Sequence, residues 1–110
     1  MSALYRMNYT GSHGEGFAVV YIGQGLILGM DQPGSRIHGT YTEDGGRLRG
    51  SMTLTGDTEG HTVGGQIMKA GQSAEMEVDW DHDLAAGRRQ QITLLGEPLQ
   101  IVLQKIGNIP

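Results

Sequence analysis

The chain has 110 residues, enough for one domain that buries roughly 65% of its unfolded surface in a single core. It has no cysteine, which excludes disulfides and thiolate metal sites, and its formal charge of −4 disfavours direct binding to nucleic-acid phosphates. No stretch approaches the ~18 consecutive apolar residues of a membrane span, and the start shows no secretion signal, so we expect a soluble, cytoplasmic protein.

Apolar and polar residues alternate with the period of two that is typical of β-strands, and the 19 glycines are spread through the chain. In chain order, the expected strands contain residues 3–10, 17–22, 26–30, 36–41, 47–54, 75–81, 92–94 and 99–104. The second strand is apolar on both faces, whereas the strand at 75–81 has a wholly acidic outer face. Residues 56–73 break the pattern, which predicts a long loop or at most one helical turn.

About eight strands in sequential order predict a single all-β domain over residues 1–110. An antiparallel up-and-down sheet that closes on itself loses both unpaired edges, so a β-barrel is the expected architecture and an open sandwich is the alternative. A barrel of this size is either filled by side chains or holds one small ligand.

Large apolar side chains on the expected strands would point into this barrel. We favour a packed core. The alternative is a cavity for a small apolar ligand, which would be lined well by methionine, whose shape adapts, and by tyrosine, which has a polar tip. The predicted inward set contains Tyr5, Met7, Phe17, Val19, Leu28, Tyr41, Met52, Met76 and Trp80.

The sequence shows no pattern typical of a catalytic or metal site. Asp79, Asp81 and Asp83 share one face of a strand, but a single strand supplies too few converging ligands to hold a hard cation. The four histidines are isolated from one another, and no Gly-x-Ser-x-Gly elbow is present. We therefore expect a protein that is not an enzyme and needs no cofactor.

Four motifs follow one another in the first half of the chain, and a fifth lies in its last strand. They are Leu4-Tyr5-Arg6-Met7, a Gly14-Glu15-Gly16 start to residues 14–20, a Gly-rich segment 25–31 that ends in Asp31, His38-Gly39-Thr40-Tyr41, and residues 99–106. In this order they resemble the GrlR-like negative regulators of type III secretion.

The resemblance implies a lipocalin-like barrel in the bacterial cytoplasm that dimerises and regulates by binding a partner protein. In the family's founding members, an acidic Glu-Asp-Glu-Asp turn contacts a transcriptional activator. This chain has Glu43-Asp44-Gly45-Gly46 at the matching place, so the resemblance implies Glu43 and Asp44 as the partner contact. The leading hypothesis is a regulator that acts through protein–protein binding, and the alternative is a carrier of a small apolar ligand.

Overall fold

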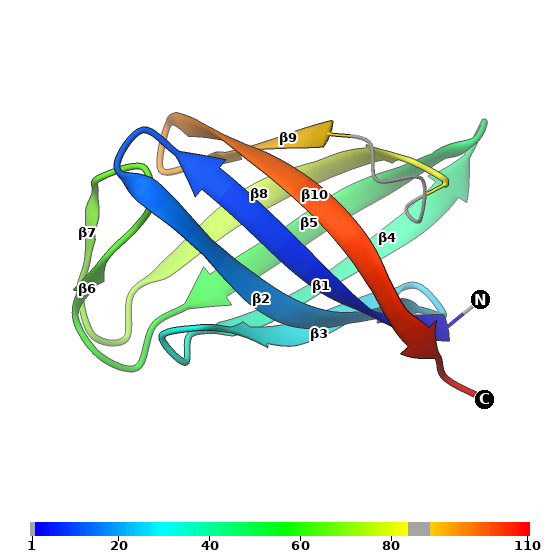
Figure 1. The fold of residues 1–110 in the computed structure, drawn as a ribbon, viewed down its shortest axis with the longest axis horizontal. Helices are drawn as coiled ribbons and strands as arrows, with labels where there is room; N and C mark the ends of the chain where they lie inside the picture. Colours follow the sequence, from blue (N-terminus) through cyan, green and yellow to red (C-terminus); the bar gives the residue numbers. More distant parts are fainter. Residues whose placement is uncertain (1, 84–88) are drawn as a thin grey trace.

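The computed structural model describes residues 2–83 and 89–110, which form β-strands and the turns between them (Figure 1). Within these ranges there is no helix. The described residues therefore contain no helix that is long and apolar enough to cross a membrane. The strands are β1 (Ser2–Gly11), β2 (Gly14–Gly23), β3 (Leu26–Asp31), β4 (Arg36–Asp44), β5 (Arg47–Thr55), β6 (Gly60–His61), β7 (Ile67–Met68), β8 (Ser73–Asp81), β9 (Arg89–Leu94) and β10 (Glu97–Asn108).

Eight of the strands form one antiparallel sheet in the order β8-β5-β4-β3-β2-β1-β10-β9, which curls almost completely into a barrel (Figure 1). This confirms the predicted all-β barrel of about eight strands. The first and last strands of the chain pair side by side, as β1 and β10. The two edge strands of the sheet are β8 and β9. Between them, the Asp81 amide donates a hydrogen bond to Oε1 of Gln90 at 3.4 Å. The barrel therefore closes between β1 and β10 and stays open along the seam between β8 and β9.

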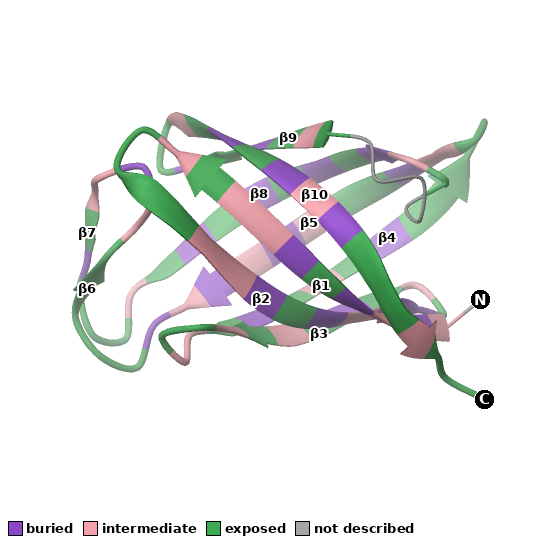
Figure 2. Cartoon of the chain, viewed as in Figure 1, coloured by how far each residue is buried: buried purple, intermediate pink, exposed green. Residues whose placement is uncertain are grey.

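Burial alternates along the strands, as Figure 2 shows for the sheet as a whole. In β8, Met76, Val78 and Trp80 are buried, whereas Glu75 and Glu77 are exposed. Large and small side chains face one another inside the barrel: Met7 lies opposite Ala18, and Ile22 lies opposite Ala3. This complementarity in size lets β1 pack closely beside β2 on the inner face of the sheet.

The inward direction predicted for Phe17, Val19 and Leu28 is wrong. In β2 the buried side chains belong to Ala18, Val20 and Ile22, so Phe17 and Val19 lie on the outer face. Leu28 is 47% exposed, and only Ile27 of β3 is fully buried. Both strands are apolar on both faces, so hydrophobicity did not determine which set points inward.

Residues 56–73, predicted to be a loop or a single helical turn, contain the short antiparallel pair β6 and β7. This pair lies across one end of the barrel, beside the turn that joins β1 to β2 (Figure 1). Backbone hydrogen bonds hold it there, since the His13 amide donates to the Val63 carbonyl at 2.7 Å. The side-chain amide of Gln66 donates to the Leu95 carbonyl at 2.8 Å. The segment is thus anchored to two turns of the barrel and partly covers its end.

Candidate functional site

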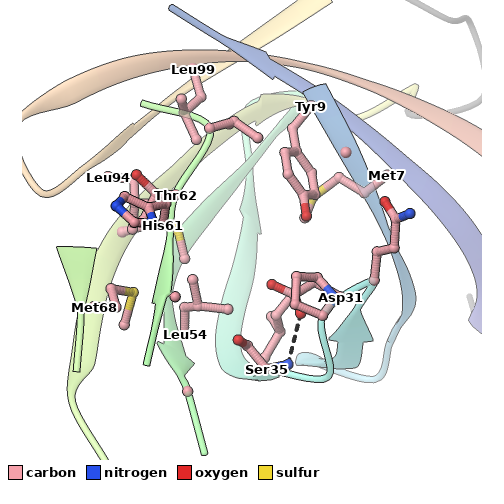
Figure 3. A pocket seen from close by; sticks show the side chains of 18 of the residues that line it. Met7, Tyr9, Asp31, Ser35, Leu54, His61, Thr62, Met68, Leu94 and Leu99 are labelled. Carbon is pink, nitrogen blue, oxygen red and sulfur yellow. Dashed lines mark hydrogen bonds between the residues drawn. The ribbon is translucent and has the colours of Figure 1, made fainter. Parts of the chain in front are cut away.

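A cavity of about 280 Å³ lies at the end of the barrel that β6 and β7 partly cover (Figure 3). Its base is apolar and buried, and side chains from β1, β4, β5, β7, β8, β9 and β10 contribute to it. These are Met7, Ile37, Leu54, Met68, Met76, Ile92, Leu94 and Leu99. The volume is just below the ~300–1,000 Å³ of typical small-molecule sites, so the cavity suits a compact apolar ligand.

The rim of the cavity is polar and exposed. It includes Glu15 at the start of β2, Gln32 after β3, and Glu59 and His61 around β6. No lysine or arginine occurs among the described residues that line the cavity. The opening is therefore predominantly acidic.

Asp31, the last residue of β3, lies partly buried on the wall between this rim and the apolar base. The turn after β3 holds the carboxylate in place, because the Ser35 amide donates to Oδ1 at 2.7 Å (Figure 3). Burial raises the pKa of Asp31 above its usual value, although hydrogen bonds from Ser35 and Gly34 act in the opposite direction. A carboxylate that is only partly compensated by the protein thus lies beside the apolar base of the cavity.

Tyr9 of β1 lies on the same wall, with its hydroxyl end directed toward Asp31 (Figure 3). The hydroxyl donates a long hydrogen bond of 3.4 Å to the Phe17 carbonyl. Burial, and secondarily the negative charge of Asp31, raises the pKa of Tyr9 to about 12. Tyr9 therefore stays neutral at physiological pH and offers an aromatic face and a hydroxyl to the cavity.

Only two residues of the predicted inward set, Met7 and Met76, line this cavity. Four others are buried in the core but do not line it: Tyr5, Tyr41, Met52 and Trp80. Phe17, Val19 and Leu28 are on the outer face. Tyr9 has the same strand phase as Tyr5 and Met7 and could have been found from that alternation. Asp31 carried no such signal, because an aspartate after a strand is also typical of an ordinary turn.

Glu43 and Asp44 lie at the opposite end of the barrel, where β4 turns into β5 (Figure 1). Both are exposed. The Asp44 carboxylate lies 3.5 Å from the Arg49 guanidinium, and that of Glu43 lies 3.6 Å from Nε2 of His82. Contacts of this kind in water contribute little, typically below about 1 kcal/mol, so both carboxylates stay available to a partner.

The acidic segment 79–83 does not gather around one point. Asp79 contacts Arg47 at 3.0 Å and Arg49 at 3.6 Å, and the hydrogen bond from Arg47 is the main cause of the lowered pKa of Asp79. In the part of the chain that the structure describes, no three His, Asp or Glu residues come together in a way that could hold a metal ion.

No family model, curated protein or solved structure matches the chain. The resemblance to GrlR-like regulators therefore stays a prediction from the sequence motifs.

Proposed function

We propose that this protein binds a small apolar molecule in the open end of its barrel. The observation that carries the proposal is the cavity of about 280 Å³ with its apolar base and polar rim. Three methionines, Met7, Met68 and Met76, belong to this base. Their unbranched, polarizable side chains adapt to the shape of a ligand at small cost. Burying each methylene group of a ligand here is worth about 0.8 kcal/mol, so a short alkyl chain suffices for measurable affinity.

A variant that fills the cavity from its cover tests this proposal. Val63 lines the cavity and packs against the core. Its hydrogen bond with the His13 amide uses the backbone carbonyl, so a change of side chain leaves that hydrogen bond in place. We expect Val63→Phe to displace about two methylene groups of bound octanol, which costs about 1.6 kcal/mol. That corresponds to roughly a tenfold loss of affinity in isothermal titration calorimetry.

Ile67→Phe is the matched control, because Ile67 belongs to the same covering segment but is 55% exposed and does not line the cavity. It should bind octanol like the unmodified protein. The proposal fails if octanol and other short apolar probes give neither heat of binding nor a thermal shift. It also fails if Val63→Phe binds octanol as tightly as the unmodified protein does.

Regulation through a partner protein is the second candidate function, and the outer face of β2 and β3 favours it. Val19, Leu26, Leu28 and Met30 are 40%, 42%, 47% and 54% exposed. Cross-strand pairing places Val19 beside Met30 and Tyr21 beside Leu28, so the side chains form one patch. Contiguous exposed apolar patches of this kind are typical of protein–protein contacts. The acidic pair Glu43 and Asp44 would add charge-dependent specificity to such a contact.

Affinity capture from the native bacterium, with each variant compared against the unmodified protein, tests the second candidate. A regulator of type III secretion that uses this surface should lose one and the same partner in Leu28→Lys and in the double variant Glu43→Gln, Asp44→Asn. The captured complex should also weaken as salt concentration rises. A partner retained equally by all variants would refute both the patch and the acidic turn as contacts.

A further inference from the structure

The residues that line the cavity indicate which charge a bound molecule should have. Asp31 is partly buried beside the apolar base, and Glu15 and Glu59 lie on the rim. His61 is the sole residue of the described lining that can become positively charged. An anionic ligand such as a fatty acid would therefore be repelled at the opening and again at Asp31.

We propose that the ligand of this cavity is a cationic amphiphile: an amine whose ammonium group pairs with Asp31 and whose apolar tail lies on the methionine-rich base. This inference rests on the proposed function and specifies its ligand class. The ammonium group would replace the water that the Asp31 carboxylate loses on burial, and charge-assisted hydrogen bonds of this type are about twice as strong as neutral ones.

Tyr9 adds a second element of recognition for the same group. Its hydroxyl end is directed toward Asp31, and its hydrogen bond to the Phe17 carbonyl, at 3.4 Å, is long enough to be exchanged for a ligand. The ring offers a π-face, which attracts a cation at short range. The ring itself is held by the chain's own packing, because a side chain at Gly16 would collide with it at 2.9 Å. A carboxylate and an aromatic ring thus lie on one wall of an apolar cavity.

The turn uses the Asp31 side chain as a hydrogen-bond acceptor, so the stability of the fold gives no reason for its negative charge. Its raised pKa means that folding penalises the ionised form, so this group makes the protein more stable as pH falls through the folded-state pKa and less stable at neutral pH. An asparagine would keep the acceptor for the Ser35 amide without carrying the charge. We therefore expect Asp31→Asn to melt at the same temperature as the unmodified protein or higher, which makes it a usable binding variant.

Three probes of equal chain length, octylamine, octanol and octanoate, separate the charge of the ligand from its apolar tail. In calorimetry at neutral pH we expect the affinity for octylamine to be higher than that for octanol by about tenfold or more. Octanoate should bind most weakly of the three. In Asp31→Asn the advantage of octylamine over octanol should disappear while octanol binds as before. Glu77→Gln is the control, because it removes an equal charge from the outer face of β8 and does not touch the cavity; it should keep the preference for octylamine.

The outcomes distinguish this inference from the function on which it rests. If octanol binds the unmodified protein as tightly as octylamine, or if Asp31→Asn keeps the full preference, the cationic ligand is refuted and the apolar site stands. If Glu77→Gln loses the preference as Asp31→Asn does, the net charge of the protein is the cause and the role of Asp31 is refuted. If none of the three probes binds, both proposals fall.

Discussion

Replacing Trp80 by alanine is expected to lower the free energy of unfolding by about 3–5 kcal/mol. Trp80 is the largest of the fully buried side chains and lies on β8 directly opposite Leu48 of β5, which is also fully buried. Removing the indole leaves a cavity that close-packed neighbours can only partly fill. Such a loss is a large part of the 5–15 kcal/mol that usually holds a domain together. Urea unfolding followed by circular dichroism measures it without relying on tryptophan fluorescence.

Trp80→Phe is the informative companion to this variant. The indole N–H of Trp80 is buried and finds no hydrogen-bond partner among the residues that the structure describes. An unpartnered buried donor costs about 1–3 kcal/mol, and phenylalanine removes that cost while it keeps most of the ring. We therefore expect Trp80→Phe to lose less than half of what Trp80→Ala loses. Equal losses in the two variants would contradict this expectation, because the retained phenyl ring would then recover none of the stability that the indole provides.

The architecture could be predicted from the sequence because strand periodicity and turn chemistry are local properties. Met76, Val78 and Trp80 alternate with acidic residues, which predicts that these three side chains point inward. In β8 they do, and all three are buried. The expected strands 17–22 and 26–30 leave only a short connection between them, and Gln24 and Gly25 in that connection have positive φ of 53° and 78°, as a two-residue hairpin turn requires. Both signals depend on neighbours within a few residues along the chain.

The site could not be predicted in the same way. Whether Val19 or Val20 of β2 points inward depends on which one fits opposite Tyr5, and that contact comes from another strand. The cavity depends further on where residues 56–73 cross the barrel end, which hydrogen bonds to His13 and Leu95 determine. Those partners lie far away in the sequence. Alternation predicts most of the residues that face the interior. The position of the cavity depends in addition on how residues 56–73 pack at one end of the barrel.

Gly39→Ala is expected to destabilise the protein by about 2–3 kcal/mol, a large effect for the addition of one methyl group. Gly39 lies in β4 between the inward-facing Ile37 and Tyr41. A Cβ on Gly39 would collide with the carbonyl oxygen of Ser51 and would lie 2.7 Å from Cα of Met52. Both are backbone atoms of the neighbouring strand β5, so no side-chain rotation relieves the collision and the two strands must move apart.

Gly107→Ala is the matched control, because Gly107 also belongs to a paired strand and a Cβ there meets no atom within 4 Å. Alanine limits the freedom of the unfolded chain, so this variant should be neutral or more stable by up to about 1 kcal/mol. The difference between the two variants in urea unfolding isolates the steric effect from the change in chain entropy, which is the same in both. If Gly39→Ala were as stable as Gly107→Ala, β4 and β5 could separate at no cost. The close approach of these two strands would then not be what holds the curvature of the barrel.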